Sequence, residues 1–240
     1  GSIFSYENGR YFWKVPKVLP YPITISFGKP MPAHAKAYEV RAAVQELSAD
    51  AFKLRGVSQK KLHIAFIDEA KKHPFKFCMA DSMGLKFNYI QVLAGVLAML
   101  KKLFSVDRKK NIENEMVGVL LPASCAAAMV NGAILCAGKI PVNLNFTTSR
   151  ESIEYAIKEC RMTKIISSRR FLEKIHLDAN DNVLFLEDIN KGINTIDKIK
   201  ALLVGFLLPS FLLKRFCVKG DKVNIEDVAT VIFSSGSTGI

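Results

Sequence analysis

The stretch 228-VATVIFSSGSTGI-240 joins a short apolar run to six small residues. Val231, Ile232 and Phe233 favour a β-strand, which we expect to cover residues 229–233. Glycines let a backbone turn tightly and approach a ligand, and backbone N–H groups and hydroxyls suit phosphate oxygens. The pattern therefore indicates a phosphate-binding loop whose candidate residues are Ser234, Ser235, Gly236, Ser237, Thr238 and Gly239.

Two better-known phosphate motifs are excluded. A Walker A loop needs Lys after its last glycine, whereas Gly239 is followed by Ile240. The G-x-G-x-x-G dinucleotide fingerprint is also absent from this stretch. Judged on residue types alone, a plain Ser/Gly turn remains the alternative.

Upstream of the loop, apolar strand patterns alternate with helical patterns. Near the start we expect a helix over 64–72 and a hairpin over 75–89. After these, we expect strands over 116–121, 139–145, 164–167 and 182–187. The helices expected around them cover 89–104, 123–137, 150–160 and 169–175. This rhythm predicts an α/β fold, with a mostly parallel sheet flanked by helices.

The order S-S-G-S-T-G after an apolar strand resembles the phosphate-loop signature of the adenylate-forming ligases. The stretches "MVGVLLPAS", "AGKIPVNLN" and "TKIISSRRFLEKI" resemble strand–helix units of the same family. The resemblance implies that residues 51–240 form the N-terminal part of an AMP-binding ligase domain. It implies ATP and Mg²⁺ as cofactors, a fatty acid as substrate, and acyl carrier protein or coenzyme A as the thiol partner. The six loop residues would hold the β- and γ-phosphates of ATP.

In that family the loop continues with one variable residue and then Pro-Lys. Ile240 stands at the variable position, so the resemblance implies that Pro-Lys follows Ile240 in the parent protein. The family's Mg²⁺ ligand, its ribose and adenine contacts and its catalytic lysine come further downstream. We therefore expect no catalytic residue and no metal ligand within these 240 residues, and no activity from them alone.

The first 32 residues are rich in aromatic residues and proline and resemble the end of a glycerolipid acyltransferase domain, with a Gly-Lys-Pro turn at Gly28–Pro30. This resemblance assigns residues 1–50 to such a domain. The order of the two parts resembles the bacterial family of bifunctional 2-acylglycerophosphoethanolamine acyltransferase/acyl-[acyl-carrier-protein] synthetases. That likeness implies a lysophospholipid acceptor and a place on the cytoplasmic side of the bacterial cytoplasmic membrane. A stand-alone long-chain acyl-CoA synthetase in the cytoplasm, or a non-catalytic membrane-binding module, remains the alternative.

Local patterns in this first part also predict structure. "ITISF", residues 23–27, alternates enough for a strand. Residues 33–52 follow a helical pattern whose inward positions we expect to be Tyr38, Val40, Val44 and Leu47.

His63 and Asp68 have the His-x4-Asp spacing with which acyltransferases activate an alcohol. They follow the Gly-Lys-Pro turn by more than thirty residues, whereas the family's pair precedes that turn. Ile64, Phe66 and Ile67 instead indicate an amphipathic helix, and we reject a catalytic role for this pair.

The net charge and the spacing of the cysteines restrict the kinds of partner and ligand that the chain could bind. The 34 Lys and Arg residues exceed the 22 Asp and Glu residues, which gives a net charge of +12 and favours anionic partners. The basic clusters are short and carry no interleaved aromatic residues, which argues against a nucleic-acid partner. The five cysteines lack metal-ligand spacing, and we expect them to be small buried hydrophobes.

The segment 201–213, "ALLVGFLLPSFLL", is apolar and is flanked by Lys198, Lys200, Lys214 and Arg215. Thirteen helical residues span about 20 Å, less than the roughly 30 Å core of a bilayer, and Pro209 should break the helix. A buried core helix and an interfacial helix against an anionic membrane surface are both compatible with this pattern.

Overall fold

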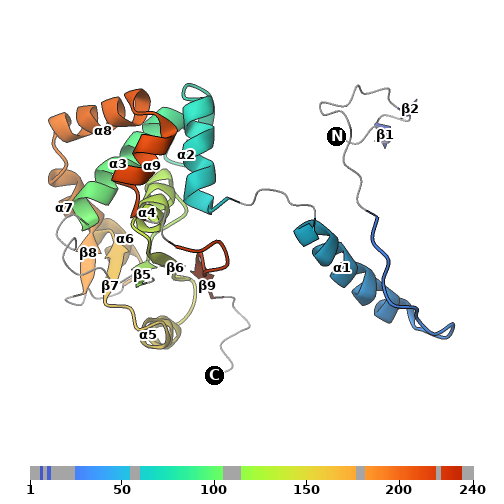
Figure 1. Ribbon diagram of the computed structural model, residues 1–240. Helices are drawn as coiled ribbons and strands as arrows, with labels where there is room; N and C mark the ends of the chain where they lie inside the picture. The colour runs from blue at the N-terminus through green and yellow to red at the C-terminus, as the bar shows by residue number, and fades with distance from the viewer. Residues whose placement is uncertain are drawn as a thin grey trace. The chain divides into compact units, whose positions relative to one another are not determined.

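The computed structural model describes residues 25–54, 60–104, 115–176, 182–219 and 223–233, together with the backbone of two short strands near the N-terminus. Contacts between Cα atoms divide the chain into two compact units, residues 1–59 and 60–240. The larger unit contains a five-stranded sheet and most of the helices (Figure 1). The candidate loop residues Ser234–Gly239 lie outside the described residues.

The elements follow one another along the chain. They are β1 (Tyr6–Glu7), β2 (Arg10–Tyr11), α1 (Ala37–Leu54), α2 (Leu62–Lys72), β3 (Phe77–Ala80), β4 (Lys86–Asn88), α3 (Tyr89–Phe104), β5 (Met116–Val119), α4 (Cys125–Cys136), β6 (Ile140–Asn143), α5 (Arg150–Glu159), β7 (Lys164–Ser167), α6 (Arg169–Lys174), β8 (Val183–Phe185), α7 (Leu186–Lys191), α8 (Thr195–Leu207), α9 (Ser210–Cys217) and β9 (Val231–Ile232).

The five-stranded sheet has the order β8-β7-β5-β6-β9, and every pair in it is parallel. All five carboxyl ends therefore lie at one edge of the sheet. The α/β fold with a parallel sheet flanked by helices is thus confirmed.

Helices cover both faces of this sheet. On one face, α3 lies among α2, α4, α7 and α8, and its buried residues include Leu93 and Val96, which are at most 1% exposed. On the other face, Ile153 of α5 and Phe171 of α6 pack with Val142 and Ile165 of the sheet. The parallel strands are therefore buried on both sides, as their apolar sequences require.

Serine caps start three of the helices that follow strands. Each cap is a serine hydroxyl that accepts a hydrogen bond from the backbone N–H three residues further along. The pairs are Ser124 with Ala127, Ser149 with Ser152 and Ser168 with Phe171. Each cap satisfies a backbone donor that has no partner inside its helix. Of these three helices, α6 begins almost directly after its strand, and α4 and α5 follow theirs after short connections.

The apolar segment 201–213 forms parts of two surface helices. Pro209 separates α8 from α9, because proline cannot continue the preceding helix. Ala201 is buried and Gly205 lies against Ile90 and Leu93, whereas Leu203 and Phe206 on the opposite side are 49% and 46% exposed. A fully buried helix is therefore excluded. None of the helices in the described parts of the chain has the length and hydropathy needed to cross a bilayer.

Predictions for the first unit were only partly correct. The helix exists, but it starts at Ala37, and Tyr38, Val40 and Val44 are 64%, 41% and 56% exposed instead of inward-facing. No hydrophobic layer covers these positions among the described residues of this unit. The boundary that we placed after residue 50 lies within α1, and the division into two domains stays a prediction.

One strand prediction was wrong, and another was correct in place but too long. Residues 25–27 form no strand, and Phe27 is 90% exposed, because no described strand pairs with them. The strand expected over 182–187 ends at Phe185, and the short helix α7 begins at the next residue. Leu186 and Ile189, three residues apart, turn into the core from that helix.

The cysteines are free thiols, as expected of small hydrophobes. Cys125 and Cys136 are buried, while Cys78, Cys160 and Cys217 are half-buried, so the expectation of burial holds fully for two of the five. Desolvation raises the pKa of the Cys136 thiol to about 12, which makes it chemically inert.

Candidate functional site

The strand that leads into the candidate loop is an edge strand of the described sheet. β9 pairs in parallel with β6, with Val231 opposite Val142 and Ile232 opposite Asn143. Phe233, the last described residue, packs with the hydrophobic cluster beneath α5 and α6. The chain therefore leaves β9 at the carboxyl edge, where ligands of open parallel sheets bind.

A polar network fastens β9 to its neighbours at this edge. The amides of Asn131 in α4 and Asn143 in β6 exchange hydrogen bonds, with Nδ2 to Oδ1 distances of 3.0 and 3.1 Å. Thr230, directly before β9, donates its hydroxyl to the carbonyl oxygen of Pro141 at 2.9 Å. Asn131 Nδ2 also donates to the carbonyl oxygen of Ala127 at 2.9 Å. These bonds tie α4 to β6, and β6 to Thr230, the residue directly before β9.

The turn after β6 lies at the same edge but bonds to itself. Asn145 Oδ1 accepts from the backbone N–H and the hydroxyl of Thr147, at 3.0 and 2.7 Å. The hydroxyl of Thr148 donates to the Asn145 carbonyl at 2.7 Å. These groups hold the turn in shape.

The N-terminus of α4 also lies at the carboxyl edge and already holds an anion. Asp81, at the start of the β3–β4 turn, accepts a hydrogen bond from the Cys125 N–H at 3.2 Å. Desolvation raises the pKa of Asp81, but bonds from the N–H groups of Cys125, Leu85 and Met83 outweigh it and lower the pKa overall. The carboxylate of Asp81 thus occupies the N-terminus of α4, a position at which helices commonly bind phosphate. Our sequence analysis missed this contact, since the position of Asp81 in a turn gives no sign of a helix 44 residues away.

The rejected pair His63 and Asp68 is not an acid–base dyad. Both lie on α2, where a spacing of five residues separates side chains by about 140° around the helix. The Asp68 carboxylate instead accepts bonds from Lys60 at 2.7 Å, from Ser210 at 2.8 Å and from Lys214. Burial alone would raise the pKa of Asp68, but these bonds lower it to about 2. Asp68 therefore joins α2 to α9.

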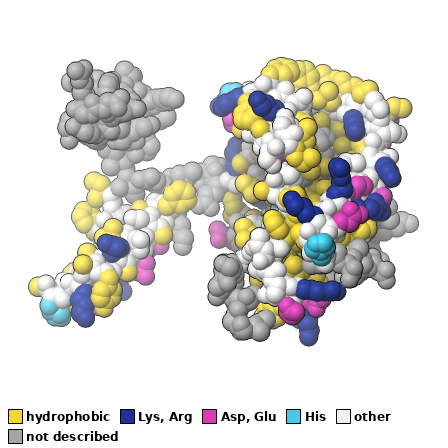
Figure 2. Space-filling model, turned by 180° about the vertical axis from the view of Figure 1, so that it is seen from behind, with side chains coloured by type: hydrophobic (Ala, Val, Ile, Leu, Met, Phe, Trp, Pro, Cys, Tyr) yellow, Lys and Arg dark blue, Asp and Glu magenta, His cyan; other side chains and the backbone are white. Residues whose placement is uncertain are grey.

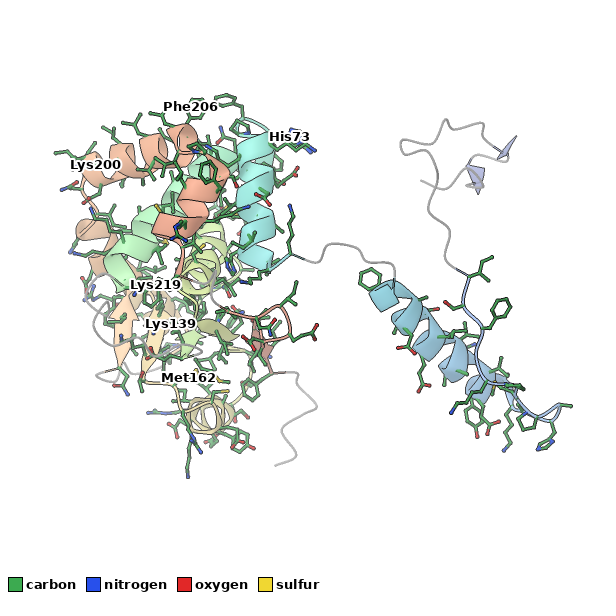
Figure 3. The ribbon with its side chains drawn as sticks, in the orientation of Figure 1. His73, Lys139, Met162, Lys200, Phe206 and Lys219 are labelled. Atoms are coloured by element: carbon green, nitrogen blue, oxygen red, sulfur yellow. The ribbon has the colours of Figure 1, made fainter. Side chains whose placement is uncertain are left out.

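A second charged cluster lies at the opposite, amino edge of the sheet. Lys139, directly before β6, forms an ion pair with Glu115, directly before β5, and both side chains are largely buried. Thr163 donates its hydroxyl to the other oxygen of Glu115 at 2.7 Å. Desolvation raises the Glu115 pKa, yet these hydrogen bonds bring it below its ordinary value. With its oxygens occupied and the carboxyl edge distant, this cluster serves the fold. Figure 3 shows Lys139 at this position.

Within the described ranges, no three His, Cys, Asp or Glu side chains come together in a way that could hold a metal ion. The geometry is that of a parallel α/β sheet with a hydroxyl- and glycine-rich segment leaving a carboxyl end. Residues 68–240 match the family described as "AMP-binding enzyme".

The chain belongs to this family. Enzymes of the family use ATP and Mg²⁺, bind a carboxylate substrate and often use coenzyme A or a carrier protein. The match begins at Asp68, within α2, and spans the five-stranded sheet and the helices α3 to α9.

Two structures of VinN show the same fold at low sequence identity. VinN is 20% identical over 75% of this chain and 43% of its own, with a TM-score of 0.55. VinN in complex with 3-methylaspartate is 20% identical over 74% and 45% of the two chains, with a TM-score of 0.53. The N-terminal domain of FACL13 from Mycobacterium tuberculosis is 12% identical over 57% and 36%, with a TM-score of 0.48. The chain thus spans less than half the length of VinN.

Proposed function

We propose that this chain forms the ATP-binding part of an enzyme that activates a fatty acid as an acyl-adenylate. A carboxylate oxygen of the fatty acid attacks the α-phosphorus of Mg-ATP. The bond from that phosphorus to the oxygen bridging to the β-phosphorus breaks, and pyrophosphate leaves with both electrons of the bond. Ser234–Gly239 hold the β- and γ-phosphates, where negative charge builds up on the leaving group.

The observation that carries this proposal is the register of β9 on β6. With Ile232 opposite Asn143, the strand ends level with its neighbour, and Phe233 leads the chain away at the ligand-binding edge. Six residues that supply hydroxyls, backbone N–H groups and two glycines follow at once. Two other segments at this edge are already occupied, because the turn after β6 bonds to itself and the N-terminus of α4 bonds to Asp81.

The acyl group then passes to a phosphopantetheine thiol. The thiol loses its proton to solvent, its sulfur attacks the acyl carbon of the adenylate, the bond from that carbon to the AMP oxygen breaks, and AMP leaves behind a thioester. We propose acyl carrier protein as the bearer of this thiol, with coenzyme A as the competitor. The net charge of +12 supports an acidic carrier protein, since opposite charges speed and orient encounters.

We further propose that a lysophospholipid accepts the acyl group in the acyltransferase to which residues 1–50 belong, at the cytoplasmic side of the bacterial cytoplasmic membrane. The exposed face of α8 and α9 supports a membrane surface as partner. Its apolar members are Ile196, Ile199, Leu202, Leu203, Phe206, Leu207 and Phe211, all at least 41% exposed. Figure 2 shows side chains of this type gathered in a band along the top of the larger unit.

Basic residues border this face, which we call the α8 face. Lys72, Lys198 and Arg215 are exposed on α2, α8 and α9. Lys71 donates to the carbonyl oxygens of Gly205 and Phe206, at 2.9 and 2.7 Å, and so satisfies the last turn of α8. Apolar side chains bordered by lysines suit an anionic lipid surface.

The proposal is tested by comparing the two candidate thiol acceptors. The full-length enzyme should be supplied with ATP, a fatty acid and either acyl carrier protein or coenzyme A, and thioester formation measured. Faster turnover with the carrier protein supports the proposal. A preference for coenzyme A, with no acylation of added lysophospholipid, would favour a stand-alone acyl-CoA synthetase. No ATP–pyrophosphate exchange with any fatty acid would overturn the fatty-acid assignment.

A further inference from the structure

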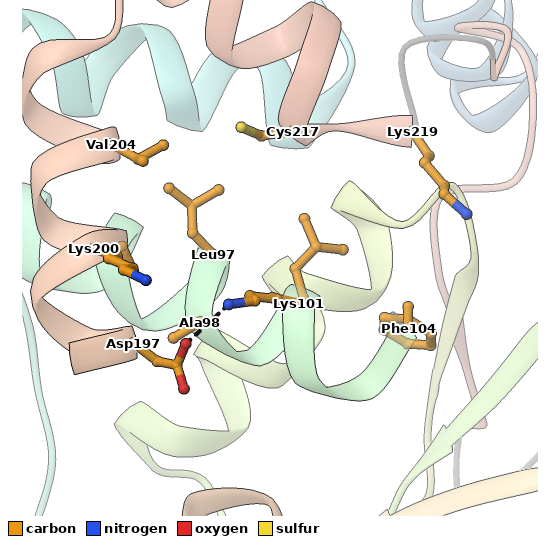
Figure 4. A pocket seen from close by; sticks show the side chains of 11 residues that line it. Leu97, Ala98, Lys101, Phe104, Asp197, Lys200, Val204, Cys217 and Lys219 are labelled. Carbon is orange, nitrogen blue, oxygen red and sulfur yellow. Dashed lines mark hydrogen bonds and ion pairs between the residues drawn. The ribbon is translucent and has the colours of Figure 1, made fainter. Parts of the chain in front are cut away.

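A cavity of about 480 Å³ lies between α3, α8 and the end of α9, entirely within the larger unit (Figure 4). Sites for small molecules commonly enclose about 300–1,000 Å³. The cavity is therefore large enough for a ligand of moderate size.

The walls of this cavity are apolar. Leu97, Leu100 and Phe104 of α3 are 5–9% exposed and line it together with Val204 of α8 and Cys217 of α9. Such walls favour a hydrocarbon chain, because apolar surface is released from water on both partners when it binds.

The rim of the cavity is basic. Lys101, Lys200 and Lys219 line it with a single acidic residue, Asp197, which leaves two positive charges in excess. Lys101 is paired with Asp197 at 2.9 Å, the contact drawn as a dashed line in Figure 4. Neither Lys200 nor Lys219 forms a salt bridge or hydrogen bond with a described residue, although Asp197 also attracts Lys200 at longer range. The rim thus has two ammonium groups available for an anion.

This cavity is separate from the candidate phosphate site. Its wall residue Phe104 lies beneath the ammonium of Lys139, 5.7 Å from the ring centre, and Lys139 is at the amino edge of the sheet. The candidate loop leaves from the carboxyl edge, at the other end of the strands.

We propose that this cavity is a second binding site, for a single-chain amphiphile with an anionic head group. The hydrocarbon chain lies against Leu97, Leu100 and Val204, and Lys200 and Lys219 hold the head group. A free fatty-acid carboxylate and a lipid phosphate share this chemistry. Binding here requires no ATP and no turnover.

Cys217 provides a readout inside the cavity. Its half-buried thiol should react slowly with N-ethylmaleimide, and a bound chain should cover it. Alkylation of Cys217 is followed by peptide mass spectrometry with dodecanoate, dodecyl phosphate or dodecanol, all below micelle-forming concentrations. Cys160 is the internal control, because it is a half-buried thiol at the end of α5 and packs with the core on the other face of the sheet.

We expect at least one of the two anions to slow alkylation of Cys217 about fivefold or more while leaving Cys160 unchanged. The anion that protects at lower concentration identifies the head group. Dodecanol has the same chain without a charge and should protect much less. Equal protection by dodecanol, or no protection by either anion, would overturn the proposal.

Three variants test whether the amphiphile binds in this cavity or elsewhere on the surface. Lys200→Gln should raise the half-protecting concentration about two- to five-fold, in line with the modest strength of exposed ion pairs. Lys198→Gln, on the same helix but outside the lining, should leave it unchanged. Leu203→Glu on the α8 face should also leave protection intact. Equal effects of Lys198→Gln and Lys200→Gln, or loss of protection in Leu203→Glu, would contradict binding within the cavity.

Discussion

Asn131 and Asn143 hold each other by two reciprocal amide hydrogen bonds between α4 and β6, beside the strand that carries the candidate loop. Both amides are half-buried. Together they align β6 on α4, and β9 takes its position from β6.

We expect Asn143→Ala to lower the free energy of unfolding by about 1–3 kcal/mol, because it leaves the Asn131 amide without its partner. For a domain of this size, each kcal/mol corresponds to a decrease in Tm of about 2–4 °C. Urea unfolding of Asn131→Ala, Asn143→Ala and the double variant measures the coupling. The double variant should lose less than the sum of the single losses, and strict additivity would show that the amides do not interact.

The carboxylate of Asp68 predicts a pH dependence of stability. Its pKa is about 2 in the folded protein, below its ordinary value of 3.8, so its contribution is present above about pH 4 and is lost as the pH falls toward 2. Asp68→Asn should therefore be less stable than the wild type at pH 6, and the difference should shrink between pH 4 and pH 2. Thermal unfolding across this range provides the measurement.

The matched control is Glu154→Gln, which breaks the exposed Arg150–Glu154 pair on α5 at 3.0 Å. Both partners are more than half exposed, so this substitution should change stability little at any pH. A pH-independent loss in Asp68→Asn would show that packing, and not charge, joins α2 to α9.

The α8 face predicts binding to lipid. Vesicles containing anionic lipid should sediment with the protein, and Leu203→Glu with Phe206→Glu should abolish this because both side chains lie exposed on that face. Tyr155→Glu on α5, where the side chain is 45% exposed, is the control and should bind as the wild type does. Equal binding to neutral vesicles, or unfolding of the double variant, would count against a membrane role.

Strongly apolar segments were predictable from the sequence. The helix Tyr89–Phe104 and the strand Lys164–Ser167 occur with the bounds expected from their patterns. The helix α7 was missed because six residues are too few to show helical periodicity. Of the four inward positions expected on α1, Leu47 is half-buried and the other three are exposed, because a helical pattern predicts an apolar face but not what covers it.

The site was predictable only through its local pattern. The strand expected over 229–233 exists, but β9 covers only Val231–Ile232, and the role of the loop stays a prediction. The bonds from Asp81 to Cys125 and from Asn131 to Asn143 could not be foreseen, since each joins residues that only the folded chain brings together.

Within the loop, Gly236 should be the position least tolerant of a side chain. A Cβ there would crowd the phosphates or prevent the backbone angles that a close approach requires. Gly236→Val in the full-length enzyme should therefore reduce adenylation severely and leave the thermal unfolding transition unchanged. Normal ATP–pyrophosphate exchange in this variant would show that the backbone at Gly236 does not approach the nucleotide.

The most direct test of the account compares the two half-reactions in Thr238→Ala. Loss of one hydroxyl donor to a charged oxygen removes about 1.5–3 kcal/mol, so adenylation measured by ATP–pyrophosphate exchange should fall roughly ten- to a hundred-fold. Thr147→Ala, at the same edge but outside the loop, is the control and should change little. Transfer of a pre-made acyl-adenylate to the thiol should be much less affected in Thr238→Ala, because pyrophosphate has already left. If thiol transfer slows as much as adenylation, the loop does not hold the pyrophosphate and the central assignment is contradicted.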